Sequence, residues 1–243
     1  AVDLFRRSGL DFEALKVAAR SRDFRPVALT GASFSGMFDV ATRQVTTRNV
    51  LARLPGTTHP DETILYTAHW DHIGIGAPDA NGDAIFNGAV DNASGVGSML
   101  AIARAMAALP KSDRPRRSIL FASVAAEEQG LLGSAYLAQN LPIPAGRLAA
   151  VINIDGINIL GATEDVVVIG RGKSDMDKIV ERISKWQKRV VVGDQFPDRG
   201  YYYRSDQFSL AKIGVPGVYL SSGVHVIGKP DGWGIEQLRN WTE

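Results

Sequence analysis

The sequence contains no cysteine, which excludes disulfide bonds, thiolate metal ligands and a cysteine nucleophile. It also contains no G-x-S-x-G segment, the turn that carries the serine nucleophile of α/β-hydrolases. Neither sign of charge is in excess, since 27 Lys and Arg residues are matched by 26 Asp and Glu residues. This balance gives no reason to expect nucleic acid or an anionic membrane surface as a partner.

Long apolar runs are missing too, and no stretch approaches the ~20 residues that a membrane-spanning helix needs. No signal peptide is visible, and the chain starts at Ala1 rather than methionine, which indicates a processed or cut end. A protein without cysteine cannot form wrong disulfides in an oxidising compartment. The composition is thus compatible with an oxidising compartment without determining it, and we expect a secreted or periplasmic location, with the leader absent from this chain.

Short apolar runs alternate with helical patterns over most of the 243 residues. Turn-forming residues bound each run, as expected for strands that are buried on both faces. Helical periodicity predicts helices at residues 94–108 and 174–189. The alternation predicts an α/β fold of three layers, with a mostly parallel central sheet and helices on both faces. The apolar runs are residues 63–68, 118–124, 151–154, 166–169 and 215–220.

The N-terminal part of the chain has a different pattern. Residues 11–20 place apolar side chains at roughly helical spacing. Residues 26–53 are rich in Val, Thr and Phe and predict two strands around the turn-prone segment GASFSG. We interpret residues 1–46 as a helix and strands that lead into the core. Residues 47–243 then form the main domain, which is large enough to bury a substantial core.

Carboxylates and a histidine follow the first three apolar runs, and another carboxylate precedes the helix at 94–108. Ligands bind at the carboxyl ends of the strands in parallel sheets, so we expect these side chains to meet at one edge. They are His69 and Asp71 after the first run, Asp91 before the helix, Glu127 and Glu128 after the second run, and Asp155 after the third.

Imidazole and several carboxylates, without sulfur, are ligands that suit zinc or a similar divalent ion. Three or more carboxylates at one edge would repel one another without cations between them. The candidates outnumber the three protein ligands that a single catalytic zinc takes, which indicates two metals ~3.5–4 Å apart. A carboxylate such as Asp91 can bridge both ions.

Two pairs of these residues have a more specific interpretation. His69 and Asp71 are spaced i, i+2, so Asp71 can accept a hydrogen bond from the imidazole and fix its tautomer. Glu127 and Glu128 are adjacent and point different ways, so one can bind metal while the other acts as a general base. An isolated pair of glutamates is usually a solvated surface. The convergence with His69 and Asp155 argues against that reading.

Five segments in the order TAHWDH, GAVDNASG, AAEEQGLLGS, INIDG and RSDQFSLAKIGVP resemble metallopeptidase family 28, the co-catalytic zinc aminopeptidases. The resemblance runs from about residue 47 to residue 235. Residues 1–25 resemble the segment that follows an inserted protease-associated domain in some members of this family. The family match implies a zinc-exopeptidase fold with that insert absent here.

The resemblance also implies two zinc ions and a role for each matching residue. The implied ligands are His69, Asp91 and Asp155 for one ion, and Asp91 with Glu128 for the other. Glu127 would be the general base that deprotonates a metal-bridging water and then protonates the leaving amine. Asp71 would orient His69.

One element departs from the family pattern. The second zinc also takes a histidine near the C-terminus, in a segment like Tyr-His-x-Pro-x-x-Asp. His225 is the only histidine after Asp155, and it lacks the preceding tyrosine. We therefore expect the chain to stop at Glu243 before this ligand, which would leave the second metal weakly held and the fragment poorly active. His225 is the alternative fifth ligand, and we interpret His72 as a structural or rim histidine.

These observations predict a metallo-aminopeptidase that hydrolyses the N-terminal peptide bond of peptides with a free N-terminus. A glutaminyl cyclase-like enzyme with one zinc is an alternative on the same fold. A carboxypeptidase-like relative is another, and its basic pocket could be supplied by Arg199 or Arg204. A non-enzymatic binding domain is the third alternative, and the presence of all five main site residues together argues against it.

Overall fold

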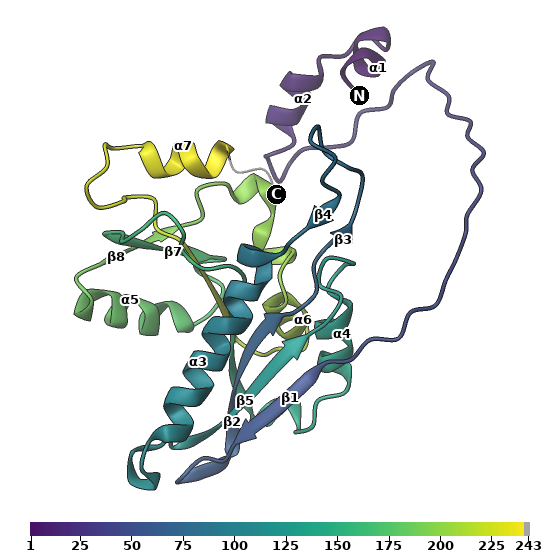
Figure 1. The fold of residues 1–243 in the computed structure, drawn as a ribbon. Coiled ribbons are helices and arrows are strands. Elements are labelled where there is room, and N and C mark those ends of the chain that lie inside the picture. Colours follow the sequence, from purple (N-terminus) through teal and green to yellow (C-terminus); the bar gives the residue numbers. More distant parts are fainter. Residues whose placement is uncertain (241–243) are drawn as a thin grey trace. The chain divides into compact units, whose positions relative to one another are not determined.

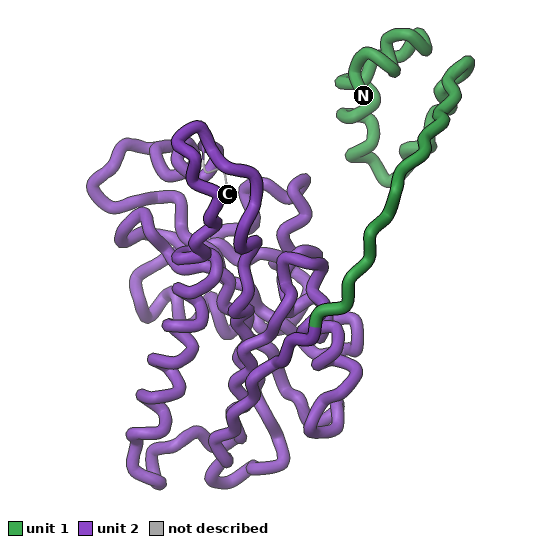
Figure 2. The backbone as a smooth tube through the Cα atoms, turned by 45° about the vertical axis from the view of Figure 1, so that its right-hand side comes forward, with its two compact units in different colours: residues 1–45 green, residues 46–243 purple. Residues whose placement is uncertain are grey.

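The computed structural model describes residues 1–240. The chain divides into a small unit, Ala1–Val45, and a larger unit that begins at Thr46 (Figure 2). The small unit contains two short helices, α1 (Val2–Arg7) and α2 (Phe12–Ala18). The Asp11 carboxylate caps α2 by accepting the backbone N–H of Ala14 at 3.0 Å. The helix predicted at 11–20 is therefore present.

The prediction of two strands within residues 26–53 is wrong for most of that range. Residues 26–49 contain no strand, and the first strand is β1 (Val50–Leu54). Phe34 and Met37 in this segment are 94% and 99% exposed, so no other part of residues 1–45 covers them. β-Propensity reflects packing on a pleated surface, and without a pairing partner it does not produce a strand.

Seven strands form the central sheet of the larger unit, in the order β1-β5-β2-β6-β9-β7-β8 (Figure 1). The four central strands β5, β2, β6 and β9 run parallel, and β7 runs parallel to β8. Antiparallel pairs join β1 to β5 and β7 to β9. The predicted mixed, mostly parallel sheet is confirmed. The strands beyond β1 are β2 (His59–His69), β5 (Arg117–Val124), β6 (Leu148–Asn153), β7 (Asp165–Ile169), β8 (Val190–Gly193) and β9 (Gly217–Ser221).

Helices cover both faces of this sheet, which gives the three predicted layers (Figure 1). On one face, Met99 of α3 packs on Phe121, and Val180 of α5 packs on neighbouring strands. On the other face, Leu137 of α4 and Leu210 of α6 pack with Leu65. Side chains alternate between faces along each strand, so the central strands carry apolar side chains on both faces. The helices are α3 (Gly95–Ala108), α4 (Leu132–Gln139), α5 (Met176–Trp186) and α6 (Gln207–Ala211).

Smaller elements surround the carboxyl ends of the strands. A two-stranded hairpin, β3 (Gly74–Ile75) with β4 (Ile85–Phe86), follows β2, and α7 (Trp233–Asn240) lies near the end of the chain. An irregular turn, Ala89–Ser94, leads from the hairpin into α3. Within residues 1–240, no helix combines the length and the apolar character needed to cross a bilayer.

Candidate metal centre

The last residue of β2, His69, lies at the centre of the candidate site and is 1% exposed. Its Nε2 lies 2.9 Å from Asp91 Oδ1 and 3.2 Å from Asp155 Oδ1. Its Nδ1 lies 3.0 Å from the backbone carbonyl oxygen of Asp71. A carbonyl oxygen only accepts hydrogen bonds, so Nδ1 carries the ring hydrogen. In the neutral imidazole, the lone pair of Nε2 therefore faces two carboxylate oxygens.

The Asn92 side chain joins the turn before α3 to the loop after β6. Its amide nitrogen donates to a backbone carbonyl of that loop at 2.9 Å. Its amide oxygen accepts the backbone N–H groups of Gly95 at 3.1 Å and Gly156 at 2.9 Å. A Cβ at Gly95 would lie 2.1 Å from the same oxygen, so the contact requires glycine. These bonds fix Asp91 and Asp155, the chain neighbours of the bonded groups.

Asp71 makes a different contact from the predicted one. Its carboxylate lies 3.7 Å from His69 Nδ1, and the backbone carbonyl of Asp71 takes the imidazole bond instead. The carboxylate accepts the backbone N–H groups of Glu127 at 3.1 Å and Glu128 at 3.3 Å. Asp71 therefore orients His69 through its main chain and holds the loop after β5 through its side chain.

The two glutamates after β5 have unlike surroundings. Burial, followed by the negative charge of Asp155, raises the pKa of Glu127 to about 8. Burial and the charge of Asp91 also raise the pKa of Glu128. The Glu128 carboxylate additionally lies 2.7 Å from His72 Nδ1. Of these two glutamates, Glu127 has no hydrogen-bonding partner for its carboxylate within residues 1–240, which suits a group that exchanges protons with a substrate.

Two groups of three side chains bring possible ligand atoms within 4.8 Å of one another, and Asp91 belongs to both. The groups are His69, Asp91 and Asp155, and His72, Asp91 and Glu128. The first contains the three ligands implied for one zinc. The second contains the two residues implied for the other zinc, together with His72, which the sequence interpretation had assigned to the rim.

His225 lies in neither group. Its ring Nδ1 is 3.3 Å from Asp165 Oδ2, its backbone N–H donates to Asp165 Oδ1 at 2.9 Å, and its side chain is 52% exposed. Asp165 is fully buried at the start of β7 and binds the His225 segment to the sheet. The contacts of His225 are therefore those of a structural residue, which does not support its alternative role as the fifth ligand.

A metal ion fits the first group on the chemistry of its donors. One buried oxygen of Asp91 has no hydrogen-bond partner in the described chain, although it lies close to His69. Burial lowers the pKa of His69, but the carboxylates of Asp155 and Asp91 beside the ring outweigh this and raise it to about 11. Without a metal, the ring therefore has to carry a second proton between two carboxylates. A divalent cation in place of that proton would be bound by all three side chains.

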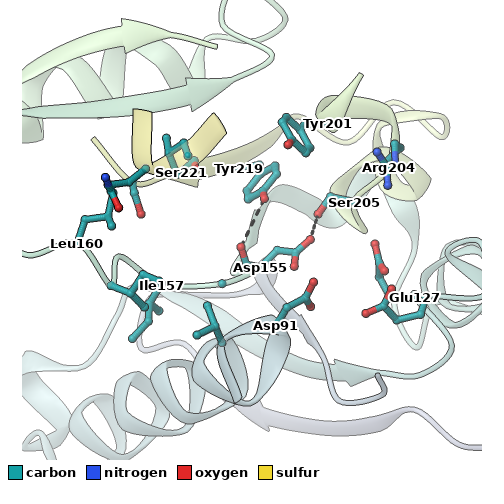
Figure 3. A pocket seen from close by; sticks show the side chains of 17 residues that line it. Asp91, Glu127, Asp155, Ile157, Leu160, Tyr201, Arg204, Ser205, Tyr219 and Ser221 are labelled. Carbon is teal, nitrogen blue, oxygen red and sulfur yellow. Dashed lines mark hydrogen bonds between the residues drawn. The ribbon is translucent and has the colours of Figure 1, made fainter. Parts of the chain in front are cut away.

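A cavity of about 230 Å³ opens directly over these groups (Figure 3). Asp91, Glu127 and Asp155 form its polar floor, and apolar side chains such as Ile157 and Leu160 form a wall on the side away from Glu127. The Ser205 hydroxyl donates to Asp155 Oδ2 from the turn before α6. The cavity therefore combines a carboxylate-rich floor with an apolar wall that can take a side chain.

Sequence reasoning missed three polar residues of this centre: His72, Asn92 and Ser205. Each of them lies inside a segment that the family resemblance rests on. Asn92 directly follows Asp91, whereas Ser205 has no predicted ligand beside it in the chain. Asparagine and serine have no ligand-type signature of their own, so only their place inside these segments could have indicated a supporting role.

Residues 49–235 match the sequence model of peptidase family M28, and the chain belongs to this family. The family resemblance inferred from the five motifs is therefore confirmed.

Curated relatives match a smaller part of the chain. A probable zinc metalloprotease of Pyrenophora teres f. teres is 42% identical over 106 residues, which are 44% of this chain and 22% of that protein. Aminopeptidase NAALADL1 of Mus musculus is 38% identical over 113 residues, 45% of this chain and 14% of that protein. The matched region thus spans about a fifth of the length of the fungal relative.

Solved structures share the fold. The zinc aminopeptidase BSAP from Bacillus subtilis superimposes with a TM-score of 0.56 at 21% identity, over 76% of this chain and 42% of that chain. Glutaminyl cyclase from Porphyromonas gingivalis superimposes with a TM-score of 0.53 at 22% identity, over 76% of this chain and 67% of that chain. At these identities the likeness establishes the architecture and leaves the reaction to be argued from the site.

Proposed function

We propose that this chain is the catalytic core of a zinc-dependent aminopeptidase that holds two zinc ions. The observation that carries the proposal is the shared carboxylate of Asp91, which belongs to two groups of three ligands at the floor of one cavity. Similarity to probable zinc metalloproteases supports zinc as the metal. Zinc bound in the two groups supplies Lewis acidity, which polarises a scissile carbonyl and acidifies an attacking water.

Residues of the protein itself transfer the proton and bind the substrate. Glu127 accepts the proton of the attacking water and passes it to the leaving amine, and burial raises its pKa to about 8, near the working pH of a general base. Asp91, Glu128 and Asp155 would hold the zinc ions, which leaves Glu127 as the one carboxylate of the cavity that is free for proton transfer. The apolar wall at Ile157 and Leu160 receives the N-terminal side chain.

The experiment compares a leucine-terminated peptide with its N-acetylated form, using the whole zinc-loaded protein. An aminopeptidase releases leucine from the free peptide and not from the acetylated one, and a chelator abolishes the release. Cleavage of both forms would instead indicate an endopeptidase or a carboxypeptidase.

A parallel assay with a glutamine-terminated peptide tests the glutaminyl cyclase alternative, because a cyclase forms pyroglutamate and releases no free amino acid. Metal analysis of the same preparation tests the ion count, and one zinc per chain would contradict the two-metal part of the proposal. A secreted or periplasmic location is part of the proposal as well, and cell fractionation of the producing organism tests it.

A further inference from the structure

We propose that Arg204 binds a carboxylate of the substrate, so that the protein prefers peptides carrying a carboxylate close to the scissile bond. This inference rests on the proposed peptidase function and adds a substrate class to it. It starts from the charges of the cavity over the metal centre. Four carboxylates line that cavity, whereas Arg204 is the one cationic side chain among its described lining residues.

Arg204 is placed to act in this cavity. Figure 3 shows its side chain on the same side of the cavity as Glu127 and Ser205, opposite Ile157 and Leu160. Its backbone N–H donates to the carbonyl of Tyr201 at 3.1 Å. The next residue, Ser205, is buried and bonded to Asp155. The backbone that carries Arg204 is therefore tied to the floor of the site.

Within residues 1–240, the guanidinium of Arg204 forms no ion pair and no hydrogen bond. Its neighbour Arg199 differs in this respect. Arg199 donates to the Tyr201 hydroxyl at 3.1 Å and lies 4.4 Å from the centre of the Phe196 ring. Arg199 is thus engaged within the protein, whereas Arg204 is free to bind a ligand.

A second cavity of about 420 Å³ adjoins the first, and Arg204 lines both. A peptide whose N-terminus lies over the metal centre and which extends from the first cavity into the second would pass Arg204. The guanidinium presents a planar fork of N–H donors that matches the two oxygens of a carboxylate. The guanidinium is consequently placed to bind an anionic group of the peptide beyond the metal centre.

The carboxylate has two possible sources, the C-terminus of a dipeptide or tripeptide and the side chain of an acidic residue after the scissile bond. Two pairs of peptides separate them. Leu-Ala is compared with Leu-Ala-amide for the terminal carboxylate, and Leu-Asp-amide with Leu-Asn-amide for the side chain. We expect the unaltered zinc-loaded protein to favour the anionic member of at least one pair by about tenfold in kcat/KM.

The variant Arg204→Gln removes the charge and keeps a polar side chain. It should abolish the preference by raising KM for the anionic peptide while kcat stays nearly constant, because ground-state binding is lost. Arg204→Lys should restore part of the preference. The matched control Arg199→Gln should keep the ratio of the unaltered protein. Thermal unfolding of each variant verifies that the fold is retained.

Equal kcat/KM values within both peptide pairs would overturn the inference, as would a preference that survives Arg204→Gln or is lost equally in Arg199→Gln. The proposed peptidase function fails separately, if no peptide is hydrolysed. The inference is then still tested by calorimetric binding of the same peptides to Glu127→Gln and to Glu127→Gln/Arg204→Gln. In the first variant the anionic peptide should bind about tenfold more tightly than its neutral partner, and in the double variant the two should bind equally.

Discussion

Replacing Asn92 with alanine should destabilise the protein and loosen its metal centre together. The side chain is 2% exposed and makes three hydrogen bonds, at 2.9, 3.1 and 2.9 Å. At about 1 kcal/mol for each bond, the variant loses about 3 kcal/mol of unfolding free energy. For a unit of this size, 1 kcal/mol corresponds to about 2–4 °C in Tm, so Tm should fall by about 6–12 °C.

The same change should weaken zinc binding by about 10- to 100-fold, because the bonds of Asn92 fix the backbone on either side of Asp91 and Asp155. Calorimetric unfolding with and without a chelator measures the first effect, and competition with a zinc indicator measures the second. Asn87→Ala is the matched control, because the Asn87 side chain is exposed and makes one bond, of 3.3 Å. A variant Asn92→Ala that unfolds within 1 °C of the unaltered protein and keeps its zinc affinity would refute the reasoning.

Three further predictions concern the site carboxylates and His72. Glu127→Gln should lower kcat by about 10²- to 10⁴-fold with unchanged zinc content, and loss of zinc along with activity would assign Glu127 to metal binding instead. His72→Ala should reduce the number of tightly held zinc ions per chain, which metal analysis measures, and two retained ions would exclude it as a ligand. In the metal-free protein, folding raises the pKa of Glu127 from 4.5 to about 8, so the folded state holds a proton there that the unfolded state has released. The stability that this proton contributes is lost as pH rises from 4.5 to about 8, so over this pH range Glu127→Gln should gain stability relative to the unaltered protein. Parallel Tm–pH curves for the two proteins would contradict this.

The apolar runs predicted the central strands well because those strands are buried on both faces. Residues 63–68 and 118–124 lie within β2 and β5, and 166–169 lie within β7. Strand direction is a different matter. The composition of an apolar run does not depend on the direction in which its strand runs, so the sequence did not indicate that β7 pairs with β9 in antiparallel orientation. The edge strand β8 was also missed, because its side chains are only partly buried.

The N-terminal segment shows the opposite error, in which composition predicted strands that the fold does not contain. Residues 26–49 have β-forming side chains, but the described chain offers them no neighbouring strand to pair with. A strand forms only when it pairs with another strand, and the sequence of one segment does not show whether that partner is present.

The site was predictable to the extent that topology alone determines it. A side chain that follows a parallel strand has its position fixed by the sheet, which is why His69 and Asp155 meet as expected, joined by Asp91 from the turn before α3. The contacts that orient these ligands depend on the direction of side chains within loops, and the sequence did not predict these directions correctly. Asp71 was expected to bind His69 through its carboxylate, but the structure uses its backbone carbonyl for that purpose. The released carboxylate holds the loop of Glu127, so the same residue positions the general base as well as the imidazole.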